Sequence, residues 1–255
     1  MILAVKIGNT TISVAGFEDD HICFSASIET RKSATIYEYT NCFVQMMSFY
    51  QISVKEISGI AIASVVPILT NVICQAWKRL NNVSILVVDT GVKTGLNIKK
   101  HHMNMGTDLI CSAVAATKLY TLPCIVISLG TATTFTAIDQ QGCFLGTSIT
   151  AGLQTSLTAL LDNTAKLSEV ELDAPNTLVG TSTVDSIKSG LIYGTASMID
   201  GMYQKYQAIL EEKATAILTG QYADMILPFC EKQYVYDEFL LLKGLHIIYQ
   251  KNQKK

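Results

Sequence analysis

Apolar and polar residues alternate along the first part of the chain. Residues 2–7, ILAVKI, and residues 11–17, TISVAGF, follow the two-residue period of half-buried β-strands. The segment between them, Gly8-Asn9-Thr10, is short and carries turn-forming residues. The pattern therefore predicts a β-hairpin at the start of the chain.

Further along, the chain changes to longer apolar runs and to helical spacing. Residues 59–67 and 84–89 predict buried strands, and residues 68–81 between them predict a helix. Residues 106–120 have apolar positions at helical spacing after Thr107 and Asp108, which predicts a helix capped at its start. Three further helices are predicted over residues 152–163, residues 184–213 and the run around 237–251.

The strand–glycine–strand pattern occurs a second time, in residues 124–139. Aligning Gly8 with Gly130 sets VKIGNTTISVA against ISLGTATTFTA. Each copy is an apolar strand, a glycine, a turn rich in hydroxyl groups and a β-branched strand. The repeat predicts two related lobes, residues 1–120 and 121–255, and the mixture of strands and helices predicts an α/β fold.

Composition and charge narrow the classes of function. The chain has 49% hydrophobic and 16% charged residues, which allows a sizeable core and disfavours disorder. Its net charge is −2 and no basic face stands out, so nucleic-acid binding has little support. The longest apolar run, residues 59–69, is too short for a membrane span, and no secretion signal is visible. We therefore expect a cytoplasmic protein without a membrane or nucleic-acid partner.

Cysteine and histidine positions give no metal or disulfide pattern. The seven cysteines are irregularly spaced and odd in number, without a C-x-x-C pair, which favours reduced thiols. The pair His101-His102 has no other ligand type at useful spacing, so a polar loop is the better interpretation.

The two glycine turns carry the candidate chemistry. Backbone N–H groups and hydroxyls in such a turn can close around a phosphate, and glycine lets the backbone approach the anion. Either turn alone is as well explained as an ordinary hairpin, whereas two copies facing a cleft favour phosphate binding. Thr219-Gly220, at the end of a predicted strand in residues 216–224, suits a turn that contacts adenine. The predicted ATP- and phosphate-binding residues are Lys6, Gly8, Asn9, Thr10, Gly130, Thr131, Thr133, Thr134, Thr219 and Gly220.

Eight segments in order resemble one family. They are IGNT (7–10), SVVP (64–67), VKTGLNI (92–98), GTDLICSAVAA (106–116), LGTATTF (129–135), FLGTSITAGLQTSLTALLDNTAKL (144–167), VGTSTVDSIKSG (179–190) and TGQYA (219–223). Together they resemble the type III pantothenate kinases of the actin-like, sugar-kinase-like superfamily. The resemblance implies a duplicated actin-like, ribonuclease H-like ATPase fold, with two related lobes and a cleft between them.

The resemblance also implies an activity. Enzymes of this family transfer the γ-phosphate of ATP to the primary hydroxyl of pantothenate, the first step of coenzyme A synthesis. They are homodimers with pantothenate at the subunit boundary, and they use Mg²⁺ and a monovalent cation, K⁺ or NH₄⁺. Asp108 matches the catalytic base. Taken alone, an aspartate there is explained equally well by a helix-capping role, and the resemblance favours catalysis. The implied pantothenate-binding residues are Gly106, Thr107, Asp108, Leu109 and Thr183.

Several positions depart from the family pattern. Lys6 stands where the family has the aspartate of the metal–phosphate end, and Leu109 replaces an arginine. Ser128 replaces the aspartate of the monovalent-cation site, at the position equivalent to Lys6 in the second hairpin. A lysine can contact phosphate as a point charge but cannot ligate Mg²⁺. Smaller departures are Ser112 for asparagine, Thr147 and Gln221 for glycines, and residues 99–103, which lack the family's tyrosine and proline.

Two hypotheses follow from these departures. The chain is a working pantothenate kinase with an altered cation requirement, or a catalytically impaired, regulatory or accessory subunit that pairs with a complete paralogue. The missing charges favour the second hypothesis for the isolated chain. A different kinase of the same superfamily is a weaker alternative, because SVVP and GTDLICSAVAA are specific to the family.

Overall fold

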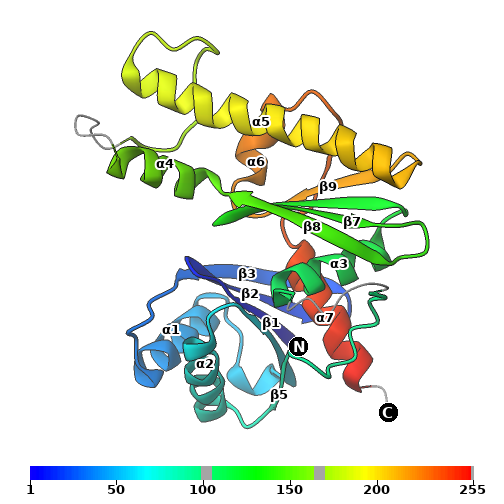
Figure 1. Ribbon diagram of the computed structural model, residues 1–255. Coiled ribbons are helices and arrows are strands. Elements are labelled where there is room, and N and C mark those ends of the chain that lie inside the picture. The colour runs from blue at the N-terminus through cyan, green and yellow to red at the C-terminus, as the bar shows by residue number, and fades with distance from the viewer. Residues whose placement is uncertain (99–104, 164–169, 254–255) are drawn as a thin grey trace. The chain divides into compact units, whose positions relative to one another are not determined.

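The computed structural model describes residues 1–98, 105–163 and 170–253. It contains two five-stranded sheets, each in a compact unit of its own (Figure 1). The first unit comprises the described residues of Met1–Gly95, His102–Ala115 and Leu240–Lys255, and the second those of Leu96–His101 and Ala116–Phe239. The division of the sequence into lobes at residue 120 stays a prediction.

The first sheet has the strand order β3-β2-β1-β4-β5. Strands β1 (Ile2–Ile7), β2 (Thr11–Glu18) and β3 (His21–Glu29) form an antiparallel meander, which confirms the predicted hairpin. Strands β4 (Gly59–Ser64) and β5 (Ser84–Val87) extend the sheet in parallel with β1. The predicted strand over residues 59–67 is wrong at its end, because Pro67 occupies the first turn of a helix. A proline is tolerated there, since a backbone N–H at that position would have no partner within the helix.

Helices cover both faces of the first sheet. Helices α1 (Ile36–Phe49) and α2 (Pro67–Leu80) share a core with one face, in which Phe43 stacks on Trp77. The 3₁₀ turn Val54–Glu56 lies between α1 and β4. The C-terminal helix α7 (Leu240–Gln253) contacts β1, β2 and β4. It approaches closely, since a Cβ on Gly59 would overlap the hydroxyl of Tyr249.

The second sheet repeats the topology of the first. Its order is β10-β9-β6-β7-β8. The antiparallel meander is β6 (Cys124–Leu129), β7 (Ala132–Ile138) and β8 (Phe144–Ala151), and the parallel strands are β9 (Thr215–Thr219) and β10 (Val235–Tyr236). Since β1 and β6 hold the same place in the two sheets, the predicted duplication is confirmed.

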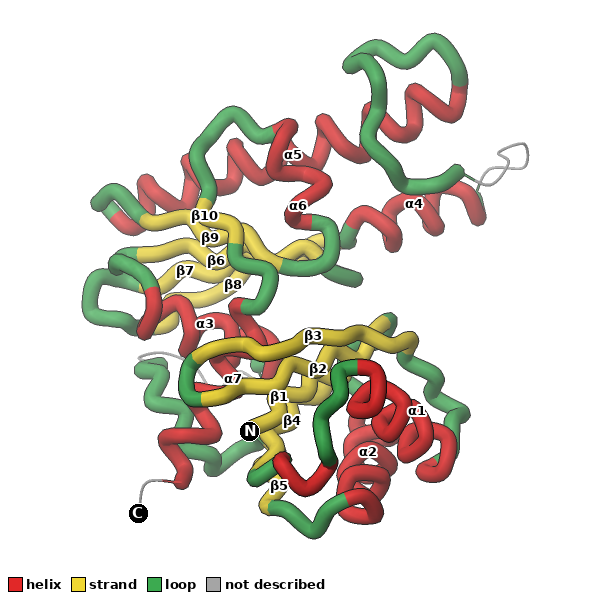
Figure 2. The backbone as a smooth tube through the Cα atoms, turned by 180° about the vertical axis from the view of Figure 1, so that it is seen from behind, coloured by secondary structure: helices red, strands yellow, loops and turns green. Residues whose placement is uncertain are grey.

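Four helical segments belong to the second unit. They are α4 (Leu153–Asp162), α5 (Thr183–Leu210), α6 (Ala223–Ile226) and the 3₁₀ turn Leu227–Phe229. Leu153 of α4 and Ile192 of α5 pack in one core with Ile127 of the sheet, on the side away from Ser128 (Figure 2). Helix α5 stops at Leu210, three residues before its predicted end, because Glu211 takes a left-handed backbone conformation with φ of 57°.

Helix α3 (Thr107–Leu119) confirms the helix predicted over residues 106–120. The helix predicted around 237–251 begins only at Leu240, because the N–H of Asp237 donates to Leu218 O and continues the pairing of β10 with β9. No helix among the described residues combines the length and the apolar character that a bilayer crossing requires.

Candidate functional site

The predicted hairpin of the first unit is held by its own backbone. The N–H of Gly8 donates to Thr11 O at 2.9 Å, and the hydroxyl of Thr30 donates to Gly8 O at 2.7 Å. A Cβ on Gly8 would lie 2.9 Å from Thr11 O, so this turn requires glycine. Asn9 and Thr10 are exposed at its tip. We call residues 7–11 the first hairpin.

Lys6 lies beside this hairpin at the end of β1. Its side chain is half-buried, and its Cε lies 3.6 Å from the point that a Cβ on Gly8 would occupy. Burial lowers the pKa of Lys6, and the negative charge of Asp108 opposes that effect. The ammonium group therefore lies close to the hairpin and within the electric field of Asp108.

Asp108 is placed by the start of α3. The hydroxyl of Thr107 donates to Ser64 O at 3.1 Å, which ties α3 to the end of β4. The N–H of Leu109 donates to Asp108 Oδ1 at 2.9 Å, and a Cβ on Gly106 would overlap this carboxylate. Asp108 therefore lies in the first turn of α3 and accepts the N–H of the next residue, whereas the Thr107 side chain binds the neighbouring strand.

Helix α7 supports α3 from the same unit. A Cβ on Gly244 would overlap the carbonyl oxygen of Cys111, so the two helices meet at backbone distance. Cys111 is fully buried, and burial, with the charge of Asp108, raises the pKa of its thiol. The first unit thus brings Lys6, Gly8 and Asp108, three of the predicted site residues, together.

The corresponding hairpin of the second unit, residues 129–133, is fastened to the start of α4. The N–H of Gly130 donates to Ala132 O at 3.1 Å. Thr131 O accepts from the N–H of Gly152 at 3.0 Å and from the hydroxyl of Thr155 at 2.7 Å. A Cβ on Gly152 would overlap Gly130 O, a requirement that the sequence pattern did not reveal. We call this turn the second hairpin.

Two predicted threonines of this strand pair lie on opposite faces. The hydroxyl of Thr133 is buried, and no described residue forms a hydrogen bond with it. Thr134 is buried and pairs with Ser128 in the β6–β7 ladder. These two residues share the face of the sheet opposite to that of Thr133. A buried hydroxyl without a partner is costly in a folded protein. Thr133 lies on the same face as Leu129 and Phe135, which belong to the apolar core of the second unit.

The turn predicted to contact adenine lies against the second hairpin. Gly220 has φ of 98°, and a Cβ there would come close to the backbone of Leu129. The N–H of Tyr222 donates to Leu129 O at 3.2 Å, and Thr219 pairs with Ser128 in the β6–β9 ladder. The second unit therefore brings Ser128, Gly130, Thr219 and Gly220 together.

Asp237 is a buried acid beside this turn that the sequence analysis did not single out. Its N–H donates to Leu218 O at 3.0 Å, which places it next to Thr219. Its carboxylate accepts from the hydroxyl of Tyr120 at 2.7 Å and from the N–H of Phe239 at 3.1 Å. No periodicity marks this residue, because its partners come from distant segments.

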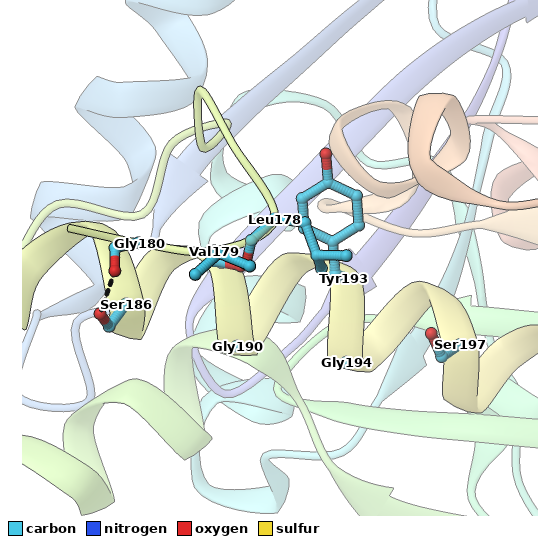
Figure 3. A pocket seen from close by; sticks show the side chains of 9 residues that line it. Leu178, Val179, Gly180, Ser186, Gly190, Tyr193, Gly194 and Ser197 are labelled. Carbon is cyan, nitrogen blue, oxygen red and sulfur yellow. Dashed lines mark hydrogen bonds between the residues drawn. The ribbon is translucent and has the colours of Figure 1, made fainter.

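Two of the remaining predicted residues lie in the first turns of helices. Leu109 is half-buried in the first turn of α3. Thr183 is the exposed first residue of α5, and among the described residues no hydrogen bond joins it to the second hairpin. The segment Leu178–Gly180 runs along α5 beside a hollow of 480 Å³ that Gly190, Tyr193 and Gly194 also line (Figure 3). The departures at residues 99–103, and His101-His102, fall outside the described residues.

The donor set does not fit a divalent metal held by the protein. Within the described ranges, no group of three or more His, Cys, Asp or Glu side chains could hold a metal ion. Lys6 carries a positive charge beside the first hairpin, and Ser128 presents a neutral hydroxyl beside the second. Mg²⁺ requires several oxygen ligands, so these side chains cannot supply its coordination shell.

The comparisons with known sequences decide the family. A sequence model described as "Type III pantothenate kinase" matches residues 2–205. The type III pantothenate kinase of Dictyoglomus turgidum is 37% identical, over 99% of this chain and all of that protein. That of Halalkalibacterium halodurans is 36% identical, over 99% of this chain and all of that protein. This chain belongs to the type III pantothenate kinase family.

Solved structures agree with the fold of this pantothenate kinase family member. A Campylobacter jejuni protein described as a Baf family transcriptional activator has a TM-score of 0.58 at 17% identity, over 99% of this chain and all of that one. The activator of 2-hydroxyisocaproyl-CoA dehydratase from Clostridium difficile has a TM-score of 0.59 at 9% identity, over all of this chain and 98% of that one. Identities this low show the fold alone, which is the duplicated, actin-like α/β fold that the sequence predicted.

Proposed function

We propose that this chain transfers the γ-phosphate of ATP to the primary hydroxyl of pantothenate, yielding 4'-phosphopantothenate and ADP. The relatives named for this activity match nearly the whole chain at 33–37% identity. The structural observation that carries the proposal is the Asp108 carboxylate, which the start of α3 holds near the first hairpin. A carboxylate beside a phosphate-binding turn is what phosphoryl transfer to an alcohol needs.

In the first unit, Asp108 acts as the general base. It accepts the proton of the pantothenate hydroxyl as that oxygen forms its bond to the γ-phosphorus. The bond from the γ-phosphorus to the β–γ bridging oxygen breaks, and the electron pair leaves with ADP. Gly106, Thr107 and Leu109 are the proposed contacts to pantothenate in this unit, with Leu109 contributing apolar surface in place of a cation. A pantothenate contact by Thr183, which belongs to the second unit, stays a prediction from the sequence.

In the second unit, the hairpin and the adjacent turn bind the nucleotide. Gly130, Thr131, Thr133 and Thr134 are the proposed phosphate contacts, because they form or adjoin the second hairpin. Thr219 and Gly220 lie next to this hairpin and are the proposed contacts to adenosine.

We propose that Mg²⁺, and K⁺ or NH₄⁺, enter the site together with the nucleotide. The described side chains do not supply a divalent site. No step of the transfer is therefore assigned to a metal held by the protein. Homodimerisation and a cytoplasmic location stay predictions.

The alternative is a catalytically impaired accessory subunit, alone or with a complete paralogue. Lys6, Leu109 and Ser128 are the substitutions that favour it. The comparisons give this alternative no support, since the relatives compared above carry the name of the active enzyme.

The decisive experiment measures phosphopantothenate formed from ATP and pantothenate by the purified chain, with Mg²⁺ and K⁺ present. We expect turnover that Asp108→Asn lowers by about 100-fold or more, because general-base catalysis typically contributes that much. Asp162→Asn, an exposed acid at the end of α4, is the matched control and keeps full turnover. Absence of turnover by the native chain, with recovery in the triple variant Lys6→Asp, Leu109→Arg and Ser128→Asp, would establish the accessory-subunit alternative instead.

A further inference from the structure

Among the described residues, the ammonium group of Lys6 has no anionic partner in an ion pair. Lys6 is half-buried in β1, yet none of the ion pairs or hydrogen bonds among the described residues uses its Nζ. Asp108 is near enough to act on it electrostatically, but the two do not form an ion pair within 4.0 Å. A half-buried cation without a partner costs stability, so this arrangement needs a reason.

The position of Lys6 supplies that reason. It is the second-to-last residue of β1, immediately before the turn at Gly8, and its side chain passes over that glycine. Its cross-strand neighbours are Ser13 and Ala63, which carry no charge to neutralise it. An ammonium group fixed beside a phosphate-binding hairpin is placed for an anion that comes from outside the chain.

The second hairpin provides an internal comparison. Ser128 holds the corresponding place in β6, with Thr134 and Thr219 as cross-strand neighbours. The two hairpins thus share a topology but differ in charge at this one position. Only the first hairpin has a basic side chain at this position.

We propose that Lys6 Nζ binds the phosphate oxygens of the nucleotide directly and so makes nucleotide binding largely independent of a divalent cation. The inference rests on the proposed function of the first hairpin as a phosphate site. It accounts both for the missing metal ligands and for the unpaired ammonium with a single residue. The fixed charge occupies the place where a bound cation would otherwise neutralise phosphate.

The test is calorimetric titration of the full chain with ATP and with adenosine, first in EDTA and then in MgCl₂. For the native chain, we expect the Kd for ATP to differ by less than about threefold between the two conditions. Lys6→Met should weaken ATP binding in EDTA by about 10- to 100-fold, the usual worth of a charged hydrogen bond, and leave adenosine binding unchanged. Lys6→Arg should stay within about threefold of the native chain, since it keeps the charge.

Two further variants keep the test decisive. Lys55→Met removes an equal charge from the exposed turn before β4 and should bind ATP like the native chain. Lys6→Ser introduces the residue found at position 128 and should reproduce the loss of ATP binding seen with Lys6→Met. It replaces Lys6→Met in the test if the methionine side chain disturbs folding. Thermal melting of each variant shows that the fold is kept.

The inference is overturned if Lys6→Met and Lys6→Ser bind ATP as the native chain does, if the native chain binds ATP only with Mg²⁺, or if it does not bind ATP at all. Phosphopantothenate formation is measured separately. Metal-independent ATP binding without any phosphopantothenate would reject the proposed reaction and leave the role of Lys6 intact. Turnover, combined with no effect of the Lys6 variants on ATP binding, would support the proposed reaction and reject the role of Lys6.

Discussion

The imidazole ring of His246 lies flat against the ring of Phe17, with centroids 4.3 Å apart and planes 5° from parallel. This stack joins α7 to β2 within the first unit. His246 Nε2 lies 2.9 Å from Gln250 Nε2 and 3.5 Å from Asp20 Oδ1, while Nδ1 is buried without a partner. One face of the imidazole ring therefore contacts an apolar side chain. Burial of the ring disfavours its positively charged form.

The first prediction concerns pH. Burial lowers the pKa of His246, against the opposing effects of the Asp19 carbonyl and the exposed Asp20 carboxylate. The folded state then binds fewer protons than the unfolded state, so stability is fully present above the unfolded pKa of about 6.5 and falls as pH drops toward the folded pKa. We expect the melting temperature of the native chain to decrease between about pH 7.5 and pH 5.5.

A matched pair of variants isolates this effect. His246→Gln should show a flatter dependence of melting temperature on pH than the native chain. His21→Gln, at an exposed position in β3, should keep the native slope. Equal slopes in His246→Gln and the native chain would show that another group causes the change.

The second prediction concerns the contact of α7 with α3. Gly244→Ala places a Cβ against the carbonyl oxygen of Cys111, and the backbone cannot yield as a flexible side chain would. We expect the free energy of unfolding to fall by about 1–3 kcal/mol, as in other overpacked cores. Turnover should fall as well, because Asp108 begins the helix that is displaced.

Gly201→Ala is the control for that change. Gly201 lies in α5, and a Cβ there would meet nothing within 4 Å. Alanine favours the helix, so unfolding should become harder by about 0.5–1 kcal/mol. Denaturant titration of both variants tests the pair, and a stabilised Gly244→Ala would contradict the observed contact.

The third prediction concerns the turn after β9. Gly220 and Gly91 have nearly the same φ, 98° and 96°, but only a Cβ at Gly220 would meet backbone atoms, those of Leu129. Gly91→Ala should cost only the strain of a left-handed residue, about 1 kcal/mol. Gly220→Ala should cost more and should also weaken ATP binding, because it separates the turn from the second hairpin. Similar losses of stability and unchanged ATP affinity in both variants would argue against this role.

The fourth prediction concerns Asp200, a buried acid in α5. Its carboxylate accepts from the N–H of Glu231 at 2.8 Å, from the N–H of Lys232 at 3.2 Å and from the hydroxyl of Tyr234 at 2.7 Å. Asp200→Asn removes the charge and one acceptor, so unfolding should become easier by about 1–3 kcal/mol. The exposed change Asp162→Asn should stay within about 0.5 kcal/mol of the native chain. Urea denaturation measures both, and equal stabilities would show that an amide satisfies these donors.

Local sequence patterns predicted much of this protein. Alternation predicted β1 and β2, helical spacing predicted α3, and the repeated glycine turn predicted the duplicated fold. These features depend on residues close together in the chain, whose spacing alone decides which side chains share a face. The order of the segments also identified the family, which the comparisons confirmed.

Only the tertiary structure showed which of these segments meet. The approach of Asp108 to Lys6, the packing of Gly244 on Cys111 and the burial of Asp237 beside Thr219 all join residues far apart in sequence. Each depends on strand order and helix packing, which are set by the burial of apolar faces over the whole unit. A hydrophobic pattern states that a face will be buried, but it carries no information about which distant segment covers it.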